Sequence, residues 1–460
     1  MSRSMKSTPA RSRPACRPEL CLNRDEGQRF VPDFAPLSSR RRAAAPLPPI
    51  EPPPMPALPA APRPELPTLL VAAALALAAA ISLGLSRFSY ALLLPPMRAD
   101  LGWSYFTAGA INTVNAAGYL VGALLTPLAM RRFGARAALL AGGGASGLLL
   151  VAHGGVTSDA ALYALRALTG VANAAAFICG GLLAARLGSG APAGHGTAPS
   201  AGLVLGVYYG GTGAGIVTAA LLVPPLCALA VTHAWQWAWV ALGAVALLAT
   251  AAMAFATRGL EGGRPVATRT PRVDWQPLRP GLLAYLLFGI GYIGYMTFVV
   301  TMLKEQGLGA AAITAFYLLL GVAVMVSSRL WAGLLQRERG GRALALLNAL
   351  LGVATLLPVL STHPLAVFAS GALFGGVMLS VVASTTALVR HNLPPEHWSA
   401  GIAAFTTVFA AGQVLGPALT GWLADGTLGL RGGLACSAAL LLIGAVVACA
   451  QRPLHPPPLR

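Results

Sequence analysis

The segment GVYYGGTGAG at residues 206–215 is matched by GQVLGPALTG at residues 412–421, so that three glycines recur at one spacing. A second series of residues recurs at almost the same spacing across the same two parts of the chain. The recurring pairs are Gly206 with Gly412, Gly210 with Gly416, Gly215 with Gly421, Tyr90 with Tyr295, Met97 with Met302, Asp100 with Glu305 and Gly102 with Gly307. An ordered set of matches indicates two copies of one structural unit in parallel orientation.

Both copies consist of long apolar runs. The twelve runs cover residues 68–95, 104–129, 137–156, 160–186, 201–230, 234–256, 281–303, 311–334, 343–361, 365–389, 399–423 and 432–451. About 20 apolar residues in a helix cross the hydrocarbon core of a bilayer, whereas barrel strands are about ten residues long and alternate in polarity. We therefore predict an all-α polytopic membrane protein with twelve transmembrane helices, arranged as two pseudo-symmetric six-helix bundles.

Composition excludes an ordinary soluble enzyme. The 460 residues are 56% hydrophobic and 10% charged, with a mean hydropathy of +0.68, whereas soluble domains are about 25% charged. The net charge of +18 raises nucleic acid as a partner, but the basic residues lie between apolar runs and form no patch with aromatic residues. We therefore expect a lipid bilayer as the environment and no nucleic-acid partner.

The domain organisation follows from breaks in the apolar pattern. Residues 1–66 contain 15 prolines and 11 Lys+Arg, and such a segment buries too little apolar surface to offset its ordering entropy. We predict a disordered cytoplasmic tail over 1–66, an N-terminal bundle over 67–257, a cytoplasmic linker over 258–279, a C-terminal bundle over 280–452 and a tail over 453–460.

Charge predicts the orientation in the membrane. If residues 1–66 are cytoplasmic, the loops on that side and the carboxyl terminus contain fifteen arginines, against Arg98, Lys304 and Arg431 on the opposite side. The positive-inside rule then places both termini in the cytoplasm, which makes the chain a multi-pass protein of the cytoplasmic (inner) membrane. The eight tryptophans fall near the ends of the runs, as expected for an interfacial belt.

The chain resembles the major facilitator superfamily (MFS) over residues 67–452. The fifth-helix signature, g-x-x-x-G-P-x-x-G-G, is matched in part at 206–215, with Gly211 in place of proline, and recurs at 412–421 with Gly416-Pro417. Arg166 and Gly170 match the fourth-helix signature R-x-x-x-G. SRFSYALLLPPM, NTVNAAGYLVG and GVYYGG look like the YbfB/YjiJ-like branch.

The resemblance implies a set of gating or structural residues. In the loop signature after the second helix, Arg131 stands where the family has aspartate and Pro127 where it has glycine. The residues that the resemblance assigns to gating or close helix packing are Arg132, Gly134, Arg136, Gly170, Gly206, Gly210, Gly215, Gly412, Gly416, Pro417 and Gly421. Glycine pairs at this spacing allow neighbouring helices to approach closely.

Arg87 and Arg166 are candidate substrate ligands, because they lie deep inside apolar runs. A charge near the midplane costs at least about 2.5–3.5 kcal/mol on insertion scales, so it should face a cavity or a partner. Asn112, Asn115 and Tyr119 form one polar stripe beside them. Snorkelling, backbone pairing and polar contacts between helices are alternative roles for these residues.

The second half offers hydroxyl and amide groups without charge. An anion held by planar arginine side chains, with neutral polar groups opposite, fits this asymmetry. The predicted substrate-binding residues are Arg87, Tyr90, Asn112, Asn115, Arg166, Tyr292, Tyr295 and Gln413.

We therefore predict a secondary active transporter of a small organic, anionic solute that works by alternating access. Proton coupling is implied by the resemblance. The chain contains no nucleotide-binding loop, catalytic Ser/His/Asp set or metal-ligand spacing. We therefore expect no enzyme activity, catalytic residue, metal or cofactor. We also expect the protein to be a monomer. Two alternatives stay open: efflux of drugs or other hydrophobic compounds, and a non-transporting membrane receptor or assembly factor.

Overall fold

The computed structural model describes residues 67–189, 201–260 and 273–454. The predicted tail 1–66, the central part of the predicted linker (261–272) and the last six residues (455–460) lie outside the described residues. The described residues all belong to one compact unit. The division of this unit into two six-helix bundles stays a prediction, and "N-terminal half" and "C-terminal half" are used below for sequence position only.

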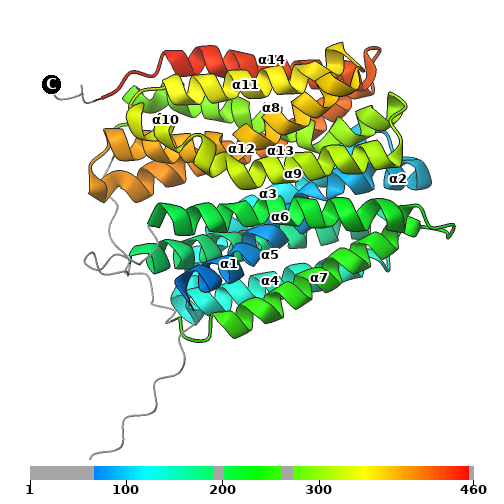
Figure 1. Ribbon diagram of the computed structural model, residues 1–460, viewed down its shortest axis with the longest axis horizontal. Coiled ribbons are helices and arrows are strands. Elements are labelled where there is room, and N and C mark those ends of the chain that lie inside the picture. Colours follow the sequence, from blue (N-terminus) through cyan, green and yellow to red (C-terminus); the bar gives the residue numbers. More distant parts are fainter. Residues whose placement is uncertain (1–66, 190–200, 261–272, 455–460) are drawn as a thin grey trace, which may run out of the picture. The chain divides into compact units, whose positions relative to one another are not determined.

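The described residues are helical throughout, with short connections. The elements are α1 (Thr68–Ala79), η1 (Ala80–Phe88), α2 (Tyr90–Leu101), α3 (Tyr105–Phe133), α4 (Ala135–His153), α5 (Asp159–Ser189), α6 (Ala201–Cys227), α7 (Ala234–Ala256), η2 (Gln276–Leu278), α8 (Arg279–Glu305), α9 (Ala310–Leu330), α10 (Ala332–Arg337), α11 (Arg342–Leu360), α12 (Pro364–Asn392), η3 (Pro395–His397), α13 (Trp398–Ala424) and α14 (Gly429–Cys449). Figure 1 shows these helices side by side, with α10 and α2 at opposite ends of the unit.

Twelve helical segments of the described chain are long and apolar enough to cross a membrane, which confirms the predicted number. The first span, Thr68–Leu101, joins α1, η1 and α2, and Ala310–Arg337 joins α9 and α10. Because successive spans alternate in direction, the segments adjoining 131–136, 258–279 and 337–342 share one end of the unit, called the Arg-rich end below. The turns at 102–104 and 306–309 lie at the opposite end.

The repeat extends to the turns at the opposite end. Gly102 ends α2 with a φ of 69°, and Gly307 follows α8 with a φ of 88°. Glycine adopts these left-handed angles without the steric cost that a Cβ imposes. The two recurring glycines therefore end corresponding helices in the same way.

Packing within each half buries continuous helix faces. In the N-terminal half α3 packs on α5, α4 on α5 and α7, and α1 on α6; in the C-terminal half α8 and α11 pack on α14, and α9 on α12. The two halves meet where α3 packs against α13 and α6 against α9, with a further contact between α2 and α8. These contacts bring the repeated segments 206–215 and 412–421 to the boundary between the halves.

The predicted interfacial belt is wrong for three of the tryptophans, because Trp103, Trp235 and Trp239 are buried in the protein. Trp235 and Trp239 are 1% and 0% exposed, because they lie one helical turn apart on the face of α7 that packs inside the N-terminal half. The ring of Trp239 lies 4.7 Å from that of His153. Trp237, on the other side of α7, is exposed. Proximity to a helix end therefore did not decide which side chains face the surroundings.

Candidate functional site

A cavity of about 300 Å³ lies between the two halves. Its walls come from η1, α3, α5 and α6 of the N-terminal half and from α8, α9, α12 and α13 of the C-terminal half. Most lining side chains are aliphatic or aromatic. Gly202 at the start of α6, Ser328 near the end of α9 and Thr386 in the last third of α12 extend the lining toward the Arg-rich end.

Arg87 is the one charged side chain among the described residues that line this cavity. It is 3% exposed, and its Nε and Nη2 atoms are buried without a hydrogen-bond partner in the described part of the chain. The guanidinium lies 5.7 Å from the centre of the Tyr119 ring, which also lines the cavity. A buried donor without an acceptor is costly, and more so when it carries charge. Arg87 is therefore suited to bind an anion that enters the cavity.

A π-helical turn positions Arg87. Residues Ala80–Phe88 form η1, and the Ser89 amide donates to the Gly84 carbonyl at 3.0 Å, a five-residue spacing. Such widened turns are rare and are often found at functional sites. The backbone of Gly84 lies against Gly215 of α6, which brings η1 close to that helix.

Tyr292 and Gln413 also line the cavity, from α8 and α13. The Gln413 Nε2 donates to the Tyr292 hydroxyl. Both side chains are buried, so this bond satisfies polar groups that have few other partners. Of the eight predicted substrate ligands, Arg87, Tyr292 and Gln413 are the three that line the cavity.

Arg166 lies behind the cavity wall, within the N-terminal half. Its Nη1 donates to the Ser86 carbonyl at 2.9 Å and its Nη2 to Asn112 Oδ1 at 3.1 Å. The rings of Tyr90 and Trp239 lie 4.8 and 5.5 Å from its guanidinium. Arg166 thus supports the π-helical turn that contains Arg87.

The other predicted ligands are bonded to protein groups outside the cavity lining. Asn112 Nδ2 donates to Thr297 Oγ1 across the boundary between the halves at 2.8 Å. Asn115 Nδ2 donates to the Arg166 carbonyl, and the Tyr90 hydroxyl donates to the Ala108 carbonyl. The hydroxyl of Tyr295 is bonded to Ser370. Their predicted roles in substrate binding stay predictions.

Close helix contacts are found at Gly170, Gly215, Gly412, Gly416 and Gly421, whereas a Cβ at Gly206 or Gly210 would meet α9 at the ordinary contact distances of 3.4 and 3.7 Å. On α6, Gly215 packs against Ala80 and Gly84, while Gly206 and Gly210 face α9. On α13, Gly412 and Gly416 face the α8 backbone at Leu286 and Ile290, while Gly421 faces Tyr105 of α3. The carbonyl of Pro417 faces Gly109 of α3, and Gly170 packs against the α3 backbone at Asn115. Small residues thus allow α6 and α13 to approach both halves.

Arg136 donates hydrogen bonds to carbonyl groups at the carboxyl-terminal end of α7. Its Nε and Nη2 donate to the carbonyls of Thr257 and Ala254, at 2.9 and 2.8 Å. The last carbonyls of a helix have no intrahelical partner, and a cation there is favourable. Gly134 forms the turn before α4 with a φ of 87°, and the Arg132 guanidinium lies 5.4 Å from the Phe133 ring. The predicted gating role of these three residues stays a prediction.

Polar contacts join the halves at the opposite end. Asp425, at the end of α13, accepts the backbone N–H groups of Tyr105 and Phe106, both at 2.8 Å. Glu305, at the end of α8, accepts the Tyr105 hydroxyl and lies 3.9 Å from Arg98 Nη1. Arg98, Tyr105, Glu305 and Asp425 are called the latch below. Opening this end requires that the latch contacts break.

Replacing Asp425 with alanine is expected to loosen the latch. The carboxylate accepts two amides at the first turn of α3, and loss of such a capping group costs about 1 kcal/mol. Spin labels at Val231 and Leu360, which are exposed at this end in the two halves, should then show a larger population of long distances. Asp274→Ala, at the Arg-rich end, is the matched control. Unchanged distances in Asp425→Ala would contradict a role for the latch.

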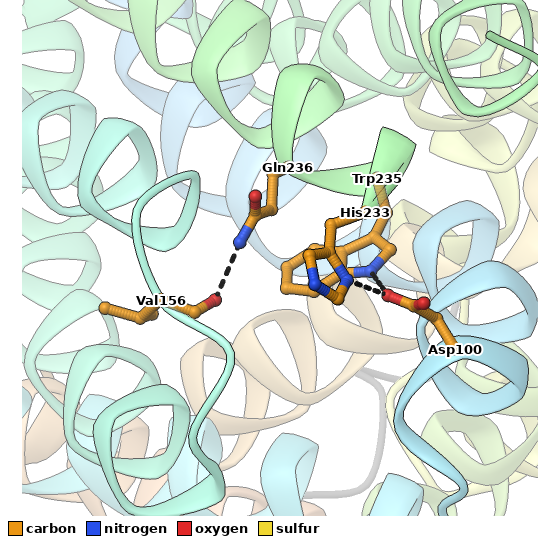
Figure 2. Close-up of polar contacts among 5 residues, drawn as sticks. All are labelled: Asp100, Val156, His233, Trp235 and Gln236. Carbon is orange, nitrogen blue, oxygen red and sulfur yellow. Dashed lines mark hydrogen bonds and ion pairs between the residues drawn. The ribbon is translucent and has the colours of Figure 1, made fainter. Parts of the chain in front are cut away.

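Asp100, which the repeat pairs with Glu305, has different partners. Its Oδ2 accepts from His233 Nδ1 and Trp235 Nε1, both at 2.5 Å, and Gln236 Nε2 donates to the Val156 carbonyl (Figure 2). These bonds anchor the turn between α6 and α7, where His233 has a φ of 53°. Asp100 therefore holds the N-terminal half together, whereas Glu305 joins the two halves.

Several residues that line the cavity were not predicted from the sequence. Phe177 and Tyr209 line the cavity from the N-terminal half, and Phe288 and Phe409 from the C-terminal half. A signal for one of them was present: Tyr285, Phe288 and Tyr292 are spaced three and four residues apart, which places them on one helix face.

A family model described as "Uncharacterised MFS-type transporter YbfB" matches residues 79–449. The chain is also 28% identical over 400 residues to a protein of Streptomyces lividans described as "Chloramphenicol resistance protein". That alignment covers 83% of this chain and 95% of the relative.

The similar solved structures include three transporters. A bacterial homologue of the human lysosomal transporter Spinster, inward-facing and unoccupied, has a TM-score of 0.63 at 14% identity, covering 84% of this chain and 97% of its own. The nucleoside transporter NupG has a TM-score of 0.61 at 13% identity, covering 83% and 98%. The human organic anion transporter MFSD10 (TETRAN) has a TM-score of 0.57 at 14% identity, covering 84% and 100%. At these identities the likeness shows the fold alone.

Proposed function

This chain belongs to the YbfB-type family of MFS transporters, and we propose that, as a secondary transporter of this family, it carries a small organic anion whose charged group binds Arg87. MFS proteins are multi-pass membrane transporters of small-molecule solutes, and they are not enzymes. The chemistry of the cavity supports the proposed class of solute, a small organic anion.

The observation that carries the proposal is the pair of unpartnered Arg87 donors at the cavity. A carboxylate accepts two parallel N–H bonds from a guanidinium, and such charge-assisted bonds are stronger than neutral ones. In an apolar cavity the bound anion also neutralises a charge that is otherwise costly to bury. Arg166 donates through Nη1 and Nη2 to Ser86 and Asn112, and it does not line the cavity. Arg87 is therefore the arginine whose unpartnered donors can reach a substrate in the cavity.

The arrangement of the halves supports alternating access. The latch joins the halves at the opposite end, while the cavity lining extends toward the Arg-rich end. By the positive-inside rule we assign the Arg-rich end to the cytoplasm. The cavity then faces the cytoplasm, with both chain termini on that side of the cytoplasmic membrane. Movement of the halves about the α3–α13 and α6–α9 contacts would open the latch and expose Arg87 to the other side.

We propose that the transport is coupled to protons. The test is uptake of labelled organic acids into proteoliposomes containing the full chain, with and without an imposed pH gradient. We expect uptake to accelerate with the gradient and to fall to the uncoupled rate when a protonophore is added. A gradient-independent rate would contradict proton coupling, and liposomes without protein give the rate of passive permeation.

A second candidate is export of uncharged hydrophobic compounds. It is favoured by the relative described as a chloramphenicol resistance protein and by the largely apolar lining of the cavity. Expression in a drug-sensitive host, with chloramphenicol as the probe, distinguishes the two functions. Resistance that persists in an Arg87→Gln variant, together with failure to transport any organic acid, would favour drug export.

A further inference from the structure

The C-terminal wall of the cavity contains a cluster of nearly parallel aromatic rings. Phe288 and Phe409 are 5.3 Å apart at 9°, and Phe288 and Tyr292 are 4.8 Å apart at 22°. Tyr285 extends the cluster, with its ring 5.0 Å from that of Phe409 at 20°. Three of the four rings, Phe288, Tyr292 and Phe409, line the cavity. This wall is therefore an aromatic surface formed by α8 and α13.

The N-terminal wall is also aromatic. Tyr119, Phe177 and Tyr209 line the cavity from α3, α5 and α6, and the rings of Phe177 and Tyr209 are 6.1 Å apart. Arg87 is on this side, with its guanidinium close to Tyr119. A ligand in the cavity thus meets aromatic rings from both halves and one cation.

The size of the cavity limits the ligand. A cavity of about 150 Å³ in another protein holds one benzene molecule, so the 300 Å³ here has room for one or two rings with a small charged group. A single cation neutralises a single negative charge, and a second charge on the ligand would stay unpaired in an apolar environment. The chemistry that fits is flat, aromatic and monoanionic.

We propose that the substrate class is aromatic monocarboxylates, with the carboxylate at Arg87 and the ring between the aromatic walls. This inference rests on the proposed anion transport and narrows it. Aromatic rings attract one another in offset-stacked and edge-to-face geometries at centroid distances of about 4.5–7 Å. An aliphatic acid of equal size would pair with Arg87 but would lack this contribution.

The test compares three probes on the purified full chain: benzoate, cyclohexanecarboxylate and benzamide. Benzoate and cyclohexanecarboxylate share the carboxylate and differ in aromaticity, whereas benzamide keeps the aromatic ring and lacks the charge. Affinity is measured by isothermal titration, because weak acids cross bilayers without a carrier. We expect benzoate to bind roughly tenfold more tightly than cyclohexanecarboxylate, within the range measured for aromatic pairs, and benzamide to bind weakest.

Phe409→Leu is expected to lower benzoate affinity roughly three- to tenfold and to remove the preference over cyclohexanecarboxylate, since leucine keeps the apolar contact without the ring. Phe288→Leu is a second variant in case the first is poorly folded. Phe255→Leu, an exposed ring on α7 away from the cavity lining, is the matched control and should bind as the wild type does.

The outcomes separate this inference from the function on which it rests. Equal affinity for benzoate and cyclohexanecarboxylate would overturn the aromatic class and leave anion binding intact. Equal affinity for benzoate and benzamide would instead overturn anion binding at Arg87. Failure of all three probes to bind at millimolar concentration would overturn the proposed class.

Discussion

Replacing Arg87 with glutamine is expected to weaken binding of the transported anion by roughly 30-fold or more, because loss of one partner of a desolvated charged hydrogen bond costs about 2–5 kcal/mol. The guanidinium supplies the one positive charge among the described lining residues, and two of its nitrogens have no protein acceptor. Glutamine keeps donor capacity but removes the charge. Arg87→Lys keeps the charge and loses the planar pair of donors, so its affinity should fall between those of the wild type and Arg87→Gln.

The measurement is equilibrium binding or the KM of uptake, at equal surface expression of each variant. Arg258→Gln is the matched control, because Arg258 is exposed beyond the end of α7 and does not line the cavity. Arg166→Lys should chiefly lower thermal stability, since Arg166 is bonded to Ser86 and Asn112 behind the wall. Unchanged affinity in Arg87→Gln would refute the anion site and favour export of uncharged compounds.

Replacing Gly84 with alanine is expected to destabilise the N-terminal half and to reduce transport. A Cβ at position 84 would lie 2.5 Å from the Cα and 2.7 Å from the carbonyl carbon of Gly215, and 2.8 Å from the Thr212 carbonyl oxygen. These are backbone atoms, so no side-chain rotation relieves the overlap. Overpacking costs about 1–3 kcal/mol and opposes the gain of about 1 kcal/mol that alanine brings to a helix.

Gly144→Ala is the matched control for Gly84→Ala, because a Cβ at position 144 in α4 meets no atom within 4 Å. This variant should melt at or slightly above the wild-type temperature in detergent, while Gly84→Ala should melt lower and give less monodisperse protein. Since Gly84 is one turn before Arg87, displacement of η1 from α6 should also lower substrate affinity. Equal melting temperatures for the two variants would show that η1 can move without cost.

Part of the candidate site could be predicted from the sequence, because it depends on single residues in unusual surroundings. Arg87 and Arg166 are conspicuous as charges within apolar runs, and both are buried in the structure. The different surroundings of the two arginines could not be predicted from the sequence. Arg87 lines the cavity with two unpartnered nitrogens, whereas Arg166, also predicted as a ligand, lies outside the lining and donates to Ser86 and Asn112. Arg87 lies in the π-helical turn η1, a kind of turn often found at functional sites, whereas Arg166 lies in the regular helix α5.

The packing of the aromatic walls of the cavity could not be predicted from the sequence either. Phe288 and Phe409 are 121 residues apart in sequence and stack because α8 packs against α13. Trp239 lies near a helix end, where an interfacial role was predicted, but packing of α4 against α7 places it beside His153 inside the N-terminal half. In each case the environment of the side chain is set by a neighbouring helix that is remote in sequence.

The number of spans, their repeat and the family followed from the sequence alone, because the length and polarity of an apolar run and the spacing of its glycines are local properties of one segment. The packing of the helices sets which face of each helix meets the cavity, which arginine presents unpartnered donors to it, and which acids join the two halves. These features depend on how helices approach and rotate against one another. That geometry is the sum of many weak contacts across α3–α13 and α6–α9, and no single segment encodes it.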